Sequence, residues 1–120
     1  MKIAVTALGE KLDSEVDPRF GRAKYFLVID TDTDQVEVHD NTPNLNAMQG
    51  AGIQAGRKVA ELGVKGILTG HVGPKAFATL QAAGITIYSG ATGTVAQAIE
   101  KFKKGELNTS GAPDVEGHWA

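Results

Sequence analysis

The stretch "KYFLVIDTDTDQVEVHD", residues 24–40, decides how the first part of the chain folds. Its first half is almost continuously apolar, which is typical of a strand that is covered on both faces of a sheet. Residues 35–40 alternate instead, with Val36 and Val38 on one face and polar side chains on the other. This alternation is typical of a half-buried edge strand. The stretch therefore predicts an antiparallel hairpin whose second strand lies at the edge of a sheet.

The acidic turn of this hairpin begins like a calcium-binding loop over residues 30–41. It departs from that pattern in two places, because Gln35 stands at the sixth position and Asn41 at the twelfth. Calcium loops of this kind need Gly and Glu there. We interpret the segment as a solvated turn.

Apolar periodicity and Gly/Pro punctuation extend the prediction along the chain. The segment before the hairpin is a strand followed by a long polar loop. After the hairpin, helices alternate with short apolar strands, and Gly73-Pro74 begins one of these helices. Thr92 or Thr94 is the N-cap of the last helix. The expected strands are 2–8, 24–30, 35–40, 66–70 and 85–88, and the expected helices are 51–62, 74–83 and 95–104.

This order, β-β-β-α-β-α-β-α, predicts an α/β fold. The first three strands form an antiparallel meander, and the later strands enter through helices. They therefore run parallel to the first strand by the right-handed crossover rule. We expect a mixed five-stranded sheet of order 3-2-1-4-5 with helices on both faces. Residues 1–104 make a single domain, and residues 105–120 are expected to be a flexible tail.

Composition narrows the function classes. The chain has 120 residues, a net charge of −2 and no cysteine. A nucleic-acid-binding domain usually carries a strongly basic face, and without cysteine there is no disulfide, thiolate metal site or Cys nucleophile. No segment has the roughly 20 apolar residues of a membrane span. We expect a cytoplasmic protein that binds neither nucleic acid nor membrane.

Four glycine-rich loops are predicted to meet at one edge of the sheet: 9–23, 41–50, 70–74 and 89–94. Ligands of open α/β sheets bind at such an edge, near the switch in strand order. Two helices begin there, and their free N–H groups favour an anion. We refer to this edge as the rim. Its candidate ligand-binding residues are Arg19, Phe20, Gly21, Arg22, Met48, Gly70, His71, Gly73, Thr92 and Gly93.

These residues have separate expected roles. Arg19 and Arg22 supply positive charge, Phe20 anchors its loop to the core, and Gly21 permits a close approach or a tight turn. His71 is either a ligand or acid–base group or a hydrogen-bonded loop histidine. Met48 offers a thioether contact or fills a gap in the core. The glycines of "GAGIQAG", residues 50–56, lack dinucleotide-fingerprint spacing, so close helix packing is the better interpretation.

The segments "DPRFGRAKYFLVID", "GAGIQAG", "ILTGHVGPKAF" and "GITIYSGATGTVAQAIEKF" stand in an order that resembles the dinitrogenase iron–molybdenum cofactor biosynthesis family. This family includes NifX-type carriers and the C-terminal domain of NifB-type proteins. The resemblance implies a ribonuclease-H-like fold. It also implies a non-enzymatic carrier that binds an iron–molybdenum cofactor, a precursor, or a molybdenum–sulfur or copper cluster such as that of the orange protein. Cluster donor and acceptor proteins would be the partners, and the chain would be a monomer or weak homodimer.

One position departs from the resemblance. Cofactor-carrying relatives often have His in an "HFG" element, and Arg19 stands there in this chain. A guanidinium stays protonated and does not ligate metal, so Arg19 is expected to clamp an anionic cluster through charge-assisted hydrogen bonds. His71 is then the candidate metal ligand at the rim.

Two other functions compete with this one. A nuclease of ribonuclease-H type needs clustered carboxylates for two metal ions, and the first and fourth strands carry none. A phosphate- or nucleotide-binding regulatory module could use the same rim, because helix N-termini do not distinguish phosphate from molybdate.

Overall fold

Five strands form one mixed sheet in the order β3-β2-β1-β4-β5, which confirms the predicted order. The computed structural model describes residues 1–41 and 51–111. Strand β2 pairs antiparallel with both β1 and β3, and β4 runs parallel to both β1 and β5. The strands are β1 (Lys2–Ala7), β2 (Tyr25–Asp30), β3 (Val36–Asp40), β4 (Gly66–Leu68) and β5 (Thr86–Tyr88).

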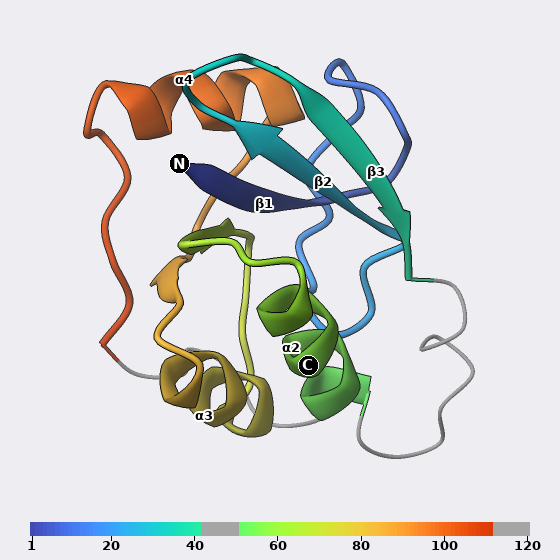
Figure 1. Cartoon of the computed structure of the whole chain (residues 1–120), viewed down its shortest axis with the longest axis vertical. Coiled ribbons are helices and arrows are strands. Elements are labelled where there is room, and N and C mark those ends of the chain that lie inside the picture. The colour runs from blue at the N-terminus through green and yellow to red at the C-terminus, as the bar shows by residue number, and fades with distance from the viewer. Residues whose placement is uncertain (42–50, 112–120) are drawn as a thin grey trace.

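Helices cover both faces of this sheet (Figure 1). Helices α2 (Ala51–Glu61) and α3 (Pro74–Ala82) pack on one face, where Phe26, Val28 and Ile67 contribute from the strands. Helix α4 (Val95–Lys103) packs on the other face. Each helix therefore buries its apolar stripe against one side of the sheet, as predicted.

Glycine and proline act where the sequence indicates. A Cβ at Gly56 would lie 2.8 Å from the Thr79 methyl carbon, so α2 and α3 approach closely at this residue. Pro74 occupies the first turn of α3, and Gly84 follows its end with a left-handed φ of 75°. The close helix packing expected for the 50–56 glycines is thus observed at Gly56.

The edge strand β3 is less buried than predicted. Val36 and Val38 are 37% and 44% exposed, although they lie on the side of the sheet that α4 covers. The reason is that α4 packs mainly against β1, the central strand, and not against the edge strand β3. The valines that were expected to face the core are therefore largely open to solvent.

The other edge strand of the sheet, β5, is covered by the segment that follows α4. Thr109 bridges to Tyr88 of β5, and the Ser110 amide donates to the Ile87 carbonyl oxygen at 2.7 Å. Leu107 packs against the core on the α4 side. These contacts differ from the flexible tail that was expected to begin at residue 105, because the segment up to Ser110 pairs with an edge strand. Residues 112–120 lie outside the described part of the chain.

None of the helices in the described ranges is long and apolar enough to cross a membrane.

Candidate functional site

Loop 8–24 is fastened to the rest of the molecule by short backbone bridges. One joins Ala7 to Val16, a second joins Glu15 to Thr94, and a third joins Arg19 to His71. The predicted meeting of the first loop with the loops that follow β4 and β5 is therefore observed. The fourth loop of the rim, including Met48, falls outside the described residues.

The bridge between Arg19 and His71 brings two of the candidate site residues together. The His71 amide donates to the Pro18 carbonyl oxygen at 2.7 Å, and the Phe20 amide donates to the His71 carbonyl oxygen at 3.1 Å. This is a single parallel bridge, called the ladder below, in which the paired residues direct their side chains to the same side. Arg19 is exposed and His71 is half-buried. The two side chains are thus presented together at the rim.

Gly70 permits this ladder to form. A Cβ there would lie 2.6 Å from both the Cα and the carbonyl oxygen of Pro18. Real Cβ atoms do not approach backbone so closely. The glycine at this position is therefore required by the contact between the two loops.

Phe20 anchors loop 8–24, called the arginine loop below, to the core, as predicted. Its side chain is fully buried, and its ring centroid lies 5.6 Å from that of Phe26. The Ala23 amide donates to the Phe20 carbonyl oxygen at 3.3 Å and closes a tight turn. Gly21 is buried within this turn without a left-handed φ. Arg22 is half-buried and has an interaction partner.

The first turn of α3 lies beside the ladder and offers backbone donors. Its N-cap, Gly73, provides no side-chain hydrogen bond, and Pro74 has no N–H. Within the described part of the chain, the amides of Lys75 and Ala76 have no hydrogen-bond acceptor; Lys75 is exposed, whereas Ala76 is fully buried. Open amides and a positive helix dipole favour an anion. This helix start is therefore suited to an anionic ligand.

The first turn of α4 differs from this expectation. The Val95 and Ala96 amides donate to carbonyl oxygens of loop residues Ser14 and Leu12, each at 2.9 Å. The Gln97 amide donates to the Thr94 hydroxyl in a capping box. The prediction that both helix starts present free amides is thus wrong for α4, because the long first loop and the N-cap occupy its donors.

Thr92 and Gly93, predicted at the rim, lie next to this closed helix start. Gly93 has a left-handed φ of 82°, and a Cβ there would lie 2.4 Å from the Gln97 side-chain oxygen. Its carbonyl oxygen accepts from the Val16 amide. These observations explain the glycine through the turn, and its role toward a ligand stays a prediction.

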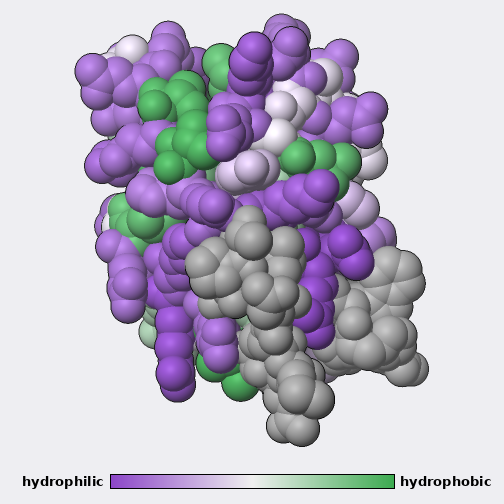
Figure 2. Space-filling model, turned by 90° about the vertical axis from the view of Figure 1, so that its right-hand side faces the viewer, coloured by the Kyte–Doolittle hydropathy of each residue, from purple (hydrophilic) through white to green (hydrophobic). Residues whose placement is uncertain are grey.

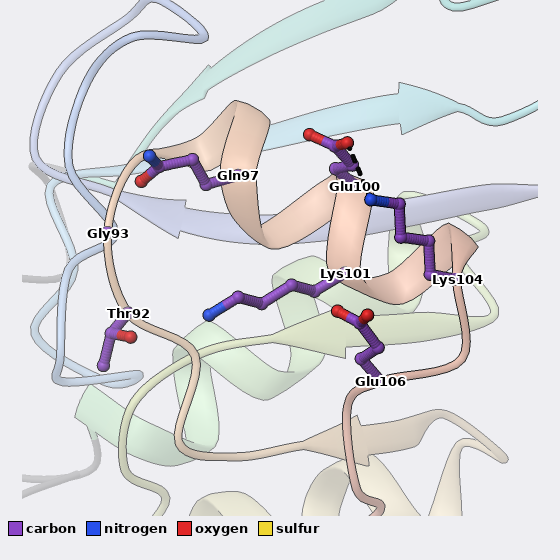
Figure 3. Close-up of a pocket in the computed structure, with 7 residues that line it drawn as sticks. All are labelled: Thr92, Gly93, Gln97, Glu100, Lys101, Lys104 and Glu106. Carbon is purple, nitrogen blue, oxygen red and sulfur yellow. Dashed lines mark ion pairs between the residues drawn. The ribbon is translucent and has the colours of Figure 1, made fainter.

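A pocket of about 330 Å³ lies along α4 (Figure 3). The Lys101 side chain extends across it toward Thr92, and Lys104 forms an ion pair with Glu100 at 3.1 Å. Of the predicted site residues, only Thr92 and Gly93 line the pocket, and neither Arg19 nor His71 does. We favour the rim as the site because the rim combines arginine side chains with an exposed helix-start amide, whereas the two lysines and two glutamates that line the pocket cancel in charge.

Asp17 is a buried residue that the sequence interpretation missed. It is 1% exposed, and its Oδ1 accepts from the Arg19 amide at 3.1 Å. Its Oδ2 has no hydrogen-bond partner in the described part of the molecule. Burial raises the pKa of this carboxyl above its ordinary value of 3.8, although the neighbouring Arg19 and Lys24 act against the shift. The pattern Asp-x-Arg before a buried Phe was the available signal.

Figure 2 shows the side of the molecule that lies on the right in Figure 1. Hydrophilic residues predominate among its described residues, and the hydrophobic patches are separate. Within the described ranges, no group of three or more His, Asp and Glu side chains could hold a metal ion. The role of His71 as a metal ligand remains a prediction.

The fold and the cationic rim are typical of a small α/β binding protein. The sequence model of the family described as "dinitrogenase iron-molybdenum cofactor" matches residues 1–105, and the chain belongs to this family. This confirms the resemblance found in the sequence. The family assignment indicates involvement in binding or carrying material related to the iron–molybdenum cofactor.

Solved structures of similar proteins agree with the fold. The apo form of the orange protein from Desulfovibrio gigas is 45% identical, with 95% of this chain and 96% of that chain covered and a TM-score of 0.93. TM1290 from Thermotoga, assigned to the DUF35 family, is 36% identical, with 97% and 98% covered and a TM-score of 0.84.

A curated relative extends the comparison to an archaeon. The uncharacterized protein MJ0580 of Methanocaldococcus jannaschii is 30% identical over 110 residues, which cover 89% of each chain.

Proposed function

We propose that this protein is a non-enzymatic carrier that binds an anionic metal–sulfur cluster at the rim. The cargo would be an iron–molybdenum cofactor, a precursor of it, or a molybdenum–sulfur or copper–sulfur cluster. Cluster donor and acceptor proteins would be its partners. The family membership supports the class of cargo, and the geometry of the rim supports the way in which the cargo is held.

The observation that carries the proposal is the ladder between Arg19 and His71 beside the uncapped start of α3. It brings a guanidinium, an imidazole and the exposed Lys75 amide close together. Guanidinium and amide N–H groups form charge-assisted hydrogen bonds with anions. Such donors bind the outer sulfur atoms of a cluster without displacing them, so a chain without cysteine can hold and release an intact cluster.

Tetrathiomolybdate, with and without Cu(I), is a suitable probe. We expect the purified protein to retain molybdenum in stoichiometric amount after gel filtration and to show visible absorption bands that differ from those of the free anion. The double substitution Arg19→Ala with His71→Ala should weaken binding at least about tenfold, because one hydrogen bond to a charged group contributes about 1.5–3 kcal/mol. Affinity is measured by titration followed by absorption.

Two control variants separate the rim from general surface charge. Arg57→Ala removes an exposed arginine of α2, and Lys101→Ala removes the amine that extends across the α4 pocket. Both should bind the probe as the unmodified protein does. Unchanged molybdenum retention in the rim double variant would refute the site. Stabilisation by nucleotides, with none by tetrathiomolybdate, would favour the regulatory alternative.

A further inference from the structure

A buried polar network lies directly beneath the arginine loop. Its members are Thr6 of β1, Asp17, and Thr69 at the end of β4, each at most 1% exposed. The Thr6 hydroxyl donates to the Asp17 carbonyl oxygen at 2.8 Å and lies 2.9 Å from the Thr69 hydroxyl. The Asp17 amide donates back to the Thr6 carbonyl oxygen at 2.9 Å. The backbone of Asp17 is therefore fixed to β1 by two hydrogen bonds to Thr6, and Thr6 in turn contacts Thr69.

The Asp17 side chain transmits this fixed position to Arg19. Oδ1 accepts the Arg19 amide two residues ahead, which is the hydrogen bond of an Asx-turn. In the ladder, His71 bonds to the residues on either side of Arg19, so the Arg19 amide is not used by His71. The Asp17 carboxyl thus accepts a hydrogen bond from the Arg19 amide, which the ladder does not use, and it sets the backbone direction at Arg19.

We propose that Asp17 is the positioning residue that holds Arg19 beside His71, through its Oδ1 bond to the Arg19 amide. This inference rests on the proposed function of the rim. The positioning depends on an acceptor atom at Oδ1, because Oδ1 is the atom that accepts the Arg19 amide, whereas Oδ2 makes no hydrogen bond to the described residues. An asparagine supplies the same acceptor without the charge.

The test compares Asp17→Asn, Asp17→Ser and Asp17→Ala. Asparagine keeps the acceptor, serine keeps a weaker one through its hydroxyl, and alanine has none. In the absence of any ligand, hydrogen exchange of the Arg19 amide should be unchanged in the asparagine variant. It should be faster in the serine variant and faster by about tenfold or more in the alanine variant. Tetrathiomolybdate affinity should fall in the same order.

Thr69→Val is the matched control, because the Thr69 hydroxyl belongs to the same buried network but bonds to Thr6, whereas the Arg19 amide bonds to Asp17. It should lower the free energy of unfolding and leave the affinity of the folded protein unchanged. The inference is overturned if the asparagine variant loses as much affinity as the alanine variant. It is also overturned if the alanine variant keeps both the slow exchange of the Arg19 amide and full affinity.

The ligand-free measurement separates this inference from the proposed function. If the unmodified protein does not bind tetrathiomolybdate, the proposed function fails, and the exchange data still decide whether Asp17 positions Arg19. If the alanine variant does not fold, the comparison of asparagine with serine decides in its place.

Discussion

Arg19 and Phe20 lie on opposite sides of a ladder that is only a few residues long. The arginine is exposed and the phenylalanine is fully buried, as expected for neighbours in an extended segment. The same alternation that serves the large strands therefore works within a loop. The buried ring fixes the loop, and the exposed guanidinium next to it gains a defined position.

The buried carboxyl of Asp17 predicts a pH dependence of stability. Because its pKa is raised in the folded state, the folded protein binds this proton more tightly than the unfolded chain does. The contribution of this group to stability therefore falls as pH rises from about 4 through the folded-state pKa, and it stays low at neutral pH. Asp17→Asn carries no such titration.

This prediction is checked by urea unfolding of both proteins at pH 4 and pH 7. The free energy of unfolding of Asp17→Asn minus that of the unmodified protein should be larger at pH 7 than at pH 4, which means that the variant gains relative stability as the pH rises. Other carboxyls cancel in this comparison because both proteins contain them. A difference in free energy of unfolding that does not change with pH would show that burial does not raise the pKa of the Asp17 carboxyl.

At the scale of the element, α4 shows how a helix start can be closed. The capping box of Thr94 and Gln97 and two loop carbonyl oxygens use the amides of its first turn. Thr94→Ala should lower the free energy of unfolding by about 1 kcal/mol, within a usual range of 0.5–2 kcal/mol. Chemical denaturation measures the change.

Thr92→Ala is the control for this substitution, because Thr92 is exposed and lies outside the capping box. It should leave stability within about 0.5 kcal/mol of the original. Equal effects of the two substitutions would contradict the assignment of Thr94 as the cap.

At the scale of the whole molecule, the two edges of the sheet are treated differently. The edge at β5 is covered by the segment that contains Leu107 and Ser110, while Val36 and Val38 of β3 remain largely exposed. Truncation after Lys104 should lower the free energy of unfolding by about 2 kcal/mol or more, from lost apolar burial and edge hydrogen bonds. It should also promote association through the uncovered edge.

Truncation after Gly111 is the matched control, since it keeps every contact described for the covering segment. Thermal unfolding and sedimentation velocity compare the two shortened chains. Equal behaviour of both would mean that the covering segment contributes nothing to the fold.

The sequence predicts nearly the whole fold because its signals are local. Alternation gives β3, Pro74 and Gly84 bound α3, and Gly56 marks close helix packing. What it does not predict depends on contacts between distant segments. Asp17 is buried where loop 8–24 is hydrogen-bonded to Thr6 of β1, and Val38 is exposed because α4 packs mainly against β1.

The candidate site is predictable to the same extent. Arg19, Phe20 and His71 could be assigned to one edge from the strand order alone. The direct pairing of Arg19 with His71 could not be predicted, because it requires the close approach of Pro18 to Gly70 that only a residue without a Cβ allows. The loss of the α4 amides to Ser14 and Leu12 is likewise a tertiary effect.

The ladder between Arg19 and His71 also sets an order of events during synthesis. Both arginines of the first loop leave the ribosome long before His71 and the first turn of α3. A nascent chain that ends before α3 therefore carries the charges of the rim without its geometry. Any ligand that needs both can be captured only after this part of the chain has been made and folded. Such a ligand binds the folded state alone and stabilises it by mass action, so loading follows folding and does not guide it.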